Sequence, residues 1–186
     1  DEDGGVLSLN IDGSAAANEE IGICSGDGTQ QLGQISDTAG SDFLTAFECR
    51  VKKSSITTQL LTVGLGQPAI VANGGIIDTN GGPMANKAFI GFNVLVDYDS
   101  VDFCYQAASA TRNDQAQDIH TLVADTFVKL GFIYNPKEVP AKRVKIYVDN
   151  VEQSTYVTAA EVATADFPDA EALAFCVLTK GVAGSA

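Results

Sequence analysis

A period of two in the apolar residues, late in the chain, limits the possible folds more than any other feature of this sequence. Apolar side chains fall on every second position over residues 128–134 and again over residues 144–148. Successive side chains of a β-strand point to opposite faces, so this period predicts two strands, each with one buried face. Asp149-Asn150 predicts a two-residue hairpin turn, because both residues tolerate a left-handed backbone. Residues 151–156 are expected to return as the partner strand.

Shorter stretches of the same period are bounded by Gly, Pro, Asn and Asp, as strands usually are. Helical signals are scarce: Thr158 and Glu161 have the spacing of a capping box, which predicts one or two helical turns. Residues 114–122 fit a helix or a strand, and we favour irregular structure that leads into a strand. Further strands are predicted at residues 6–11, 20–24, 43–51, 57–65, 88–96, 103–105 and 172–179.

Length and composition favour a single folded unit. The chain has 186 residues, of which 45% are hydrophobic, enough to bury a core of its own. No internal repeat and no linker is visible, so we expect one domain over residues 1–186. About ten short strands with little helix predict an all-β fold of two antiparallel sheets packed face to face.

The charge balance argues against two classes of partner. Twenty-four acidic residues against 11 basic ones give a net charge of −13. Such a field repels nucleic-acid phosphates and anionic lipids, so we expect neither a nucleic acid nor a membrane as partner. No apolar run approaches the roughly 18 residues of a membrane-spanning helix. The first residue is not Met, which leaves open a removed leader or a numbering that covers only part of a longer chain.

Catalytic motifs are absent from the sequence. There is no G-x-S-x-G, and His120 has no Ser or Cys neighbour that would suggest a triad, so a surface role is favoured. A glycoside hydrolase needs two carboxylates close together, and no strand offers them at alternate positions. Asp97 and Asp99 come nearest, but they lie in turn-like sequence. The sequence therefore predicts a protein that is not an enzyme and has no cofactor.

Metal sites are also disfavoured. Asp97, Asp99 and Asp102, or Asp78 and Asn80, offer oxygen ligands for calcium, but no EF-hand spacing occurs. The four cysteines stand singly, without the paired spacing of a zinc site. We expect four reduced, structural thiols, with one disulfide as the alternative, and Cys49 on an inward face. These four are Cys24, Cys49, Cys104 and Cys176.

Two segments are candidates for binding a partner. A Gly-rich stretch over residues 73–83 predicts a long surface loop, and such loops often carry binding residues. Basic residues gather over residues 50–53 and 137–145, where they form either a solvated strand face or a positive patch for an acidic partner. The candidate partner-binding residues are Asn73, Gly74, Gly75, Lys142, Arg143 and Lys145.

The alternating segment resembles a known family. Residues 127–134 followed by residues 144–152 are similar to the late hairpin of concanavalin A-like, laminin-G-type sandwiches, with Asp149-Asn150 where the family usually has Asp-Gly. Ile90-Gly91-Phe92 with Phe103 resembles an earlier strand pair of the same family. This resemblance implies an antiparallel two-sheet jelly-roll sandwich. Phe127 stands where these domains commonly have Trp, which weakens a lectin interpretation.

A second resemblance concerns function. Residues 151–158 and Phe167-Pro168-Asp169 are similar to a continuation found in small virion proteins of tailed bacteriophages. That resemblance implies a non-enzymatic decoration or cement protein on the virion's capsid surface, with the major capsid protein and further copies of the chain as partners. The alternative is a carbohydrate-binding module. Its aromatic platforms would be chosen from Tyr98, Tyr105, Tyr134, Tyr147 and Tyr156.

Overall fold

The computed structural model describes residues 7–9, 20–25, 33–35, 43–67, 70, 86–94, 99–169 and 171–181. Its strands and helices are β1 (Glu20–Cys24), β2 (Gly33–Gln34), β3 (Thr45–Val51), β4 (Gln59–Gly66), β5 (Phe89–Val94), β6 (Ser100–Gln106), β7 (Asn113–Thr121), β8 (Val128–Tyr134), the 3-10 helix η1 (Pro140–Lys142), β9 (Val144–Val148), β10 (Val151–Val157), α1 (Ala159–Val162) and β11 (Ala172–Gly181).

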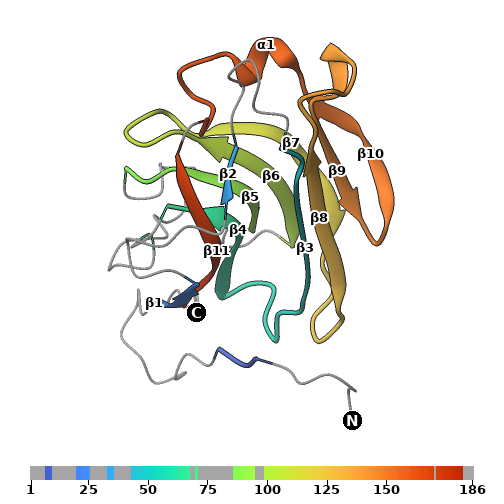
Figure 1. The fold of residues 1–186 in the computed structure, drawn as a ribbon. Helices are drawn as coiled ribbons and strands as arrows, with labels where there is room; N and C mark the ends of the chain where they lie inside the picture. Colours follow the sequence, from blue (N-terminus) through green and yellow to red (C-terminus); the bar gives the residue numbers. More distant parts are fainter. Residues whose placement is uncertain are drawn as a thin grey trace.

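These strands form two antiparallel sheets that lie face to face (Figure 1). The larger sheet has the order β1-β11-β4-β5-β6-β7, with β2 also paired to β11, and the smaller sheet has the order β10-β9-β8-β3. This arrangement confirms the predicted all-β jelly-roll sandwich of two antiparallel sheets with little helix. The smaller sheet contains the strands predicted over residues 128–134 and 144–148.

The predicted hairpin is confirmed in detail. β8 pairs with β9, and β9 pairs with β10 through Val148 and Val151. Asp149 and Asn150 have φ values of 48° and 66°, the two left-handed residues that a type I′ turn requires. Asp149 also accepts a hydrogen bond at Oδ1 from the Lys129 amide at 2.9 Å, which ties the turn to the start of β8.

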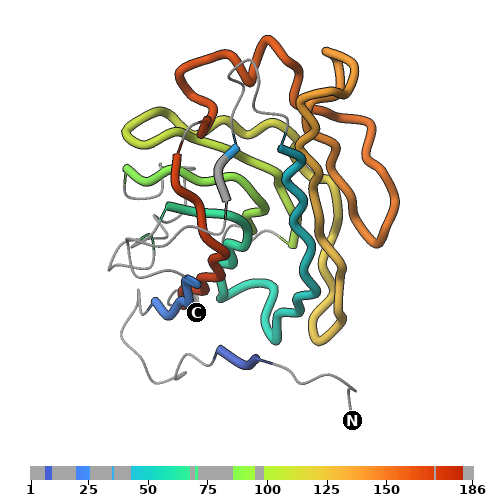
Figure 2. Tube along the Cα trace, viewed as in Figure 1, coloured from blue at the N-terminus to red at the C-terminus, as the bar shows by residue number. Residues whose placement is uncertain are grey.

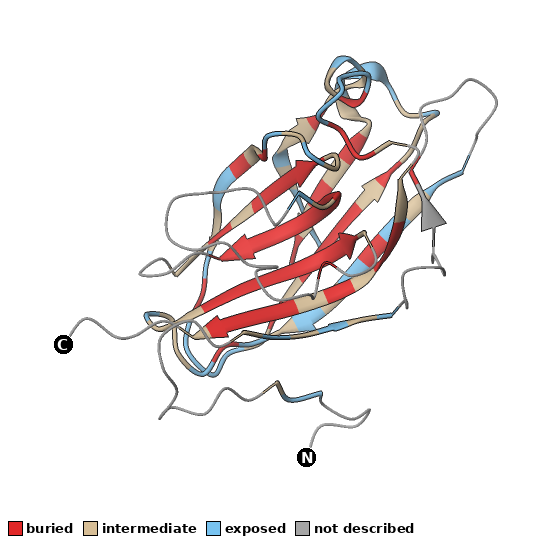
Figure 3. Cartoon of the chain, turned by 90° about the vertical axis from the view of Figure 1, so that its left-hand side faces the viewer, coloured by how far each residue is buried: buried red, intermediate tan, exposed pale blue. Residues whose placement is uncertain are grey.

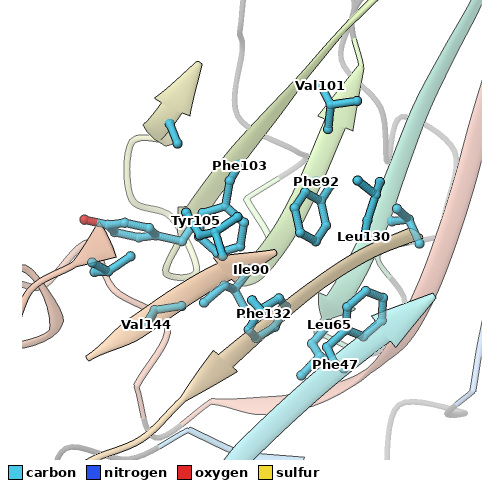
Figure 4. Close-up of a cluster of buried hydrophobic side chains, with 14 of the residues drawn as sticks. Phe47, Leu65, Ile90, Phe92, Val101, Phe103, Tyr105, Leu130, Phe132 and Val144 are labelled. Atoms are coloured by element: carbon cyan, nitrogen blue, oxygen red, sulfur yellow. The ribbon is translucent and has the colours of Figure 1, made fainter. Parts of the chain in front are cut away.

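The core lies between the two sheets and is rich in aromatic rings (Figure 4). Phe103 of the larger sheet meets Phe132 of the smaller sheet edge to face, with 5.6 Å between ring centroids. Phe47 also stacks on Phe132, with 5.5 Å between ring centroids. Cys49 packs against this core, as predicted. Phe43 differs from the expected pattern: it precedes β3, where no partner strand covers it, and is 75% exposed.

The central strands of the larger sheet are buried on both faces, as Figure 3 shows. Gly64 of β4 lies opposite Gly91 of β5, and a Cβ on Gly64 would come within 2.8 Å of the Gly91 Cα. Glycine is therefore required where these two backbones approach. A second apolar cluster covers the outer side of this sheet and includes Leu60, Ile70, Phe89, Cys104, Cys176 and Leu178.

One predicted region differs from the structure. Residues 113–121 form the edge strand β7, where irregular structure was predicted. The alternation is hidden because the pairing with β6 shifts register twice, and Asp118 takes a left-handed φ of 54°. His120 lies half-buried on this strand.

The remaining sequence predictions have mixed outcomes. The predicted strands near β1, β3, β4, β5, β6 and β11 are confirmed, and the Thr158–Glu161 capping box is present at the start of α1. Residues 7–9 are not in a strand, and the rest of the predicted strand over residues 6–11 lies outside the described residues. Asn73, Gly74 and Gly75 also lie outside them. No helix in the described ranges is long and apolar enough to cross a membrane.

Candidate functional site

The outward-facing side of the smaller sheet carries a groove. We call this side the hairpin face; it comprises the outward side chains of β3, β8, β9 and β10 together with those of η1 and the turns beside it. The strands alternate strictly, so Val144, Ile146 and Val148 enter the core while Lys145 and Tyr147 point outward. The groove has a volume of about 420 Å³. It is lined by Ala46, Phe47, Glu48, Lys129, Gly131, Phe132, Ile133, Tyr147 and Asn150.

Polar groups meet in the wall of this groove. The Lys129 ammonium lies 3.1 Å from Glu48 Oε1 and donates to Asn150 Oδ1 at 3.2 Å. These three residues come from β3, β8 and the β9–β10 turn, so the groove depends on the register of the sheet. Glu48 is directly opposite Gly131, whose missing side chain leaves space beside Tyr147 on the neighbouring strand.

A second network lies next to the groove on β10 and η1. Tyr156 donates from its hydroxyl to Glu152 Oε1 at 3.0 Å, and Tyr147 donates to Glu152 Oε2 at 3.4 Å. Lys142 donates to the Tyr156 hydroxyl at 2.9 Å, with its ammonium 4.2 Å from the centre of that ring. The hydrogen bond from Tyr156, followed by that from Lys142, lowers the pKa of Glu152. The hydrogen bond to Tyr156 raises the pKa of Lys142. The network holds both tyrosine rings in place.

The basic residues predicted to form a positive patch lie in a surface of mixed charge. Lys142 is paired with Glu152 at 3.4 Å, and Lys145 is paired with Glu138 at 2.7 Å. The Glu138 carboxylate raises the pKa of Lys145 through this hydrogen bond. Arg143 lies between them in the chain, half-buried, and its carbonyl accepts from the Asn135 amide. The sequence revealed the cations but not their acidic partners, which lie up to ten residues away on other elements.

The outer side of the larger sheet has a different chemistry. Thr62 donates to Asn93 Oδ1 at 3.0 Å, and both side chains are buried. Asp102, next across the sheet from Asn93, accepts from the Asp118 amide at 2.8 Å. Burial raises the pKa of Asp102, and the nearby carboxylate of Asp114 adds to this effect.

Two carboxylates of unequal environment therefore face the same side of β6 and β7. Asp114 is held by Arg112, with distances of 2.8 and 3.0 Å between the guanidinium and the carboxylate. Asp102 has no such cation at hydrogen-bond distance and has a raised pKa. This pair was not predicted from sequence, because its members lie on different strands that only the pairing of β6 with β7 brings together. The described residues contain no group of three or more His, Cys, Asp or Glu side chains that could hold a metal.

Similarity to known proteins is found among solved structures. No protein-family model matches the sequence. No curated protein matches it either. Among solved structures, a β-glucanase of Bacillus licheniformis aligns with a TM-score of 0.49 and 14% identity, over 90% of this chain and 67% of that chain.

A native glycosidic hydrolase aligns with a TM-score of 0.45 and 15% identity, over 74% of this chain and 52% of that chain. This chain thus spans about half the length of the second structure. Both of these structures are glycosidic hydrolases. They contradict the expectation that the chain is not an enzyme, which rested on the search for two carboxylates within one strand. That search overlooked pairs formed across strands, such as Asp102 and Asp114.

Proposed function

We propose that this chain is a carbohydrate-binding domain and that the groove of the hairpin face holds the saccharide. One observation carries this proposal: the Tyr147 ring lies in the same groove as the polar side chains of Glu48, Lys129 and Asn150. A sugar presents an apolar C–H face and a rim of hydroxyl groups. An aromatic ring beside fixed donors and acceptors matches both parts.

The volume and the rigidity of the groove support the proposal. A groove of about 420 Å³ is in the range of ligand sites, which have volumes of roughly 300–1,000 Å³. Lys129 is already positioned by Glu48 and Asn150, and the Tyr147 hydroxyl is positioned by Glu152. A ligand that meets side chains already ordered pays less conformational entropy on binding.

The burial of each tyrosine decides whether its ring can stack against a bound sugar. Tyr105 and Tyr134 are buried in the core, where no ligand reaches their rings. Tyr98 lies outside the described residues. Tyr147 and Tyr156 are half-buried on the hairpin face, and only Tyr147 lines the groove. We therefore assign the stacking role to Tyr147.

The test is a glycan array followed by calorimetric titration with the best oligosaccharide. Tyr147→Ala removes the ring and is expected to weaken binding about tenfold or more, whereas Tyr147→Phe keeps the ring and stays within about threefold of the wild type. Leu44→Ala, at an exposed position that does not line the groove, is the control and is expected to bind like the wild type. Absence of any bound glycan, or unchanged affinity in Tyr147→Ala, would contradict the proposal.

A second candidate function is decoration of a bacteriophage capsid, with the major capsid protein as partner, further copies of the chain beside it and the virion surface as location. It is supported by the resemblance of residues 151–158 and residues 167–169 to virion proteins. In this interpretation the hairpin face, including Lys142, Arg143 and Lys145, contacts the capsid. A protein that binds only the assembled shell stabilises that shell against dissociation.

This second candidate is tested with emptied capsids. If the chain decorates capsids, it co-sediments with them and raises their melting temperature, and Lys142→Glu with Lys145→Glu reduces both effects. A chain that neither sediments with the capsids nor shifts their melting would exclude this function. The same samples can be assayed with the free oligosaccharide as competitor, which separates the two candidates.

A further inference from the structure

Two of the four cysteines lie directly opposite each other on neighbouring strands. Cys24 ends β1 and is the register partner of Cys176 in the middle of β11. Figure 2 shows the two strands side by side, with β1 in blue next to β11 in red, although they lie far apart in the sequence. Both residues are free thiols in this structure. No other strand pairs with β1 among the described residues.

The hydrogen bonds around this pair define its spacing. The Ser25 amide donates to the Phe175 carbonyl at 2.9 Å, one residue beyond Cys24 and one before Cys176. In an antiparallel ladder, that bond marks Cys24 and Cys176 as a non-hydrogen-bonded pair. The Cα atoms of such a pair are about 4.5 Å apart, and their side chains are closer than in a hydrogen-bonded pair. A disulfide needs a Cα separation of about 4.4–6.8 Å.

Both side chains also point to the same side of the sheet. Cys176 belongs to the apolar cluster on the outer side of the larger sheet, and Cys24 packs against that cluster. The neighbouring Cys24 thiol contributes, after burial, to the raised pKa of the Cys176 thiol. On the far side of Cys176, a Cβ on Gly66 would come within 2.9 Å of its Sγ, so glycine there leaves space for this sulfur.

The other two cysteines cannot compete for either partner. Cys104 lies on β6, which is separated from β11 by both β4 and β5. Strands in a sheet are about 4.8 Å apart, so this separation is far too large for a disulfide. Cys49 lies on β3 of the other sheet and faces the core between the sheets.

We propose that Cys24 and Cys176 form a redox-sensitive site, which closes to a cross-strand disulfide in an oxidising environment and fastens the edge strand β1 to the body of the sheet. β1 has five residues and pairs with β11 alone, and Ile21 and Ile23 are 38% and 37% exposed. Little else among the described residues holds this strand. A covalent link at its C-terminal end therefore prevents it from separating and exposing the edge of β11.

The chemistry uses a small-molecule disulfide, such as oxidised glutathione, as the oxidant. The thiolate of Cys24, which is half-buried and the more accessible of the pair, attacks one glutathione sulfur and releases one glutathione thiolate. Cys176 then loses its proton to water, and its sulfur attacks the Cys24 sulfur and releases the second glutathione thiolate. The two protein thiols lose two electrons and two protons, and oxidised glutathione gains the two electrons. Because Cys176 is fully buried, the second step is expected to be the slower one.

The test is equilibration of the intact chain in glutathione buffers of increasing oxidised fraction. Samples are quenched in acid, alkylated in denaturant and analysed by peptide mass spectrometry. The expected result is one disulfide that joins the peptides containing Cys24 and Cys176, with Cys49 and Cys104 alkylated. The oxidised chain is expected to melt about 5–15 °C above the reduced chain, because the link closes a long loop in the unfolded state.

Two variants make the result decisive. Cys24→Ser is expected to form no disulfide and to melt at the same temperature in both buffers. Cys49→Ser removes a thiol of similar exposure that lies opposite Leu130 and not opposite a cysteine, and it is expected to keep the disulfide and the melting shift. Four alkylated thiols in the oxidised wild type, a glutathione adduct that persists on Cys24, or a link between any other two cysteines would overturn the proposal. The reduced wild type is a reference that needs no substitution.

Discussion

The two outer sides of this sandwich differ in what stabilises them. The outer side of the larger sheet carries a buried apolar cluster and the buried hydrogen bond between Thr62 and Asn93, with the ion pair of Arg112 and Asp114 at its β7 edge. The hairpin face of the smaller sheet carries tyrosines and charged side chains that pair in contact with water. Burial away from water therefore stabilises the outer side of the larger sheet. The hairpin face is held by hydrogen bonds and ion pairs, which contact with water weakens.

This difference separates residues that maintain the fold from residues that are free to bind. A buried, tightly packed side tolerates few substitutions, because each one leaves a clash, a cavity or an unsatisfied polar group. Exposed ion pairs contribute little to stability, so the hairpin face can be changed at small cost to the fold. A surface of that kind suits a ligand site better than the outer side of the larger sheet.

The largest expected contrast comes from introducing a methyl group at a glycine of each sheet. Gly64→Ala places a Cβ 2.8 Å from the Gly91 Cα and 3.0 Å from Phe89 Cζ, and it also overlaps the Ile90 carbonyl. We expect the free energy of unfolding to fall by about 3 kcal/mol or more, as measured by urea denaturation. Gly131→Ala meets one close atom, the Phe47 carbonyl oxygen at 2.9 Å, and is expected to cost about 1 kcal/mol. If both variants lose the same unfolding free energy, the two sheets do not differ in this respect and the comparison fails.

Replacing a buried and an exposed lysine gives a second contrast, in which the larger effect is a gain in unfolding free energy and not a loss. Lys53 is 5% exposed, its ammonium has no hydrogen-bond partner among the described residues, and burial lowers its pKa to about 8. Lys53→Met is expected to raise the unfolding free energy at pH 7 by about 1–3 kcal/mol, because the unpaired buried amine is removed. Lys145→Met, the matched change on the hairpin face, is expected to have little effect. A destabilised Lys53→Met variant would contradict this interpretation.

The Lys53 variant also has a predicted pH dependence. The pKa of Lys53 is lower in the folded chain than in the unfolded chain. The unfolded chain therefore binds more protons than the folded chain between about pH 8 and pH 10.5. The unfolding free energy of the wild type should therefore rise over this interval relative to that of Lys53→Met, and the advantage of the variant should shrink. Below about pH 8 the difference should be constant. Urea denaturation of the wild type and of Lys53→Met at pH 7, 9 and 10.5 measures this difference in unfolding free energy.

The smallest contrast compares single hydrogen bonds. Thr62→Val removes the donor to Asn93 and leaves a buried amide oxygen without this partner, which is expected to cost about 1–2 kcal/mol. Tyr156→Phe removes the hydroxyl that donates to Glu152 beside water, and it is expected to cost less than about 0.5 kcal/mol. Urea denaturation of both variants decides the comparison. If Tyr156→Phe costs as much as Thr62→Val, the network on the hairpin face is structural.

Local features of the fold were predictable from sequence. The period of two over residues 128–134, the turn at Asp149-Asn150 and the capping box at Thr158 each depend on neighbours in the chain, and all three are confirmed. The strand β7 was missed because two register shifts and a left-handed Asp118 break the alternation. A pattern of fixed period cannot reveal a strand that interrupts that period.

The candidate site was less predictable, because strand pairing creates it. Nothing in the chain near Tyr147 indicates that Glu48 lies across the same groove, about one hundred positions earlier. Asp102 and Asp114 likewise come together only through the pairing of β6 with β7. Basic residues were visible as a group, but the pairing of Lys145 with Glu138 depends on how the β8–β9 loop folds back. A register assignment is needed before any of these contacts can be inferred.

Backbone amide chemical-shift mapping during an oligosaccharide titration tests the central claim most directly, since it reports on both outer sides at once. If the hairpin face is the ligand site, the amides of Gly131, Tyr147 and Asn150 shift in proportion to bound ligand, while those of Thr62 and Asn93 do not. Shifts that gather instead around Thr62, Asn93 and Asp102, with the hairpin face unchanged, would contradict the account.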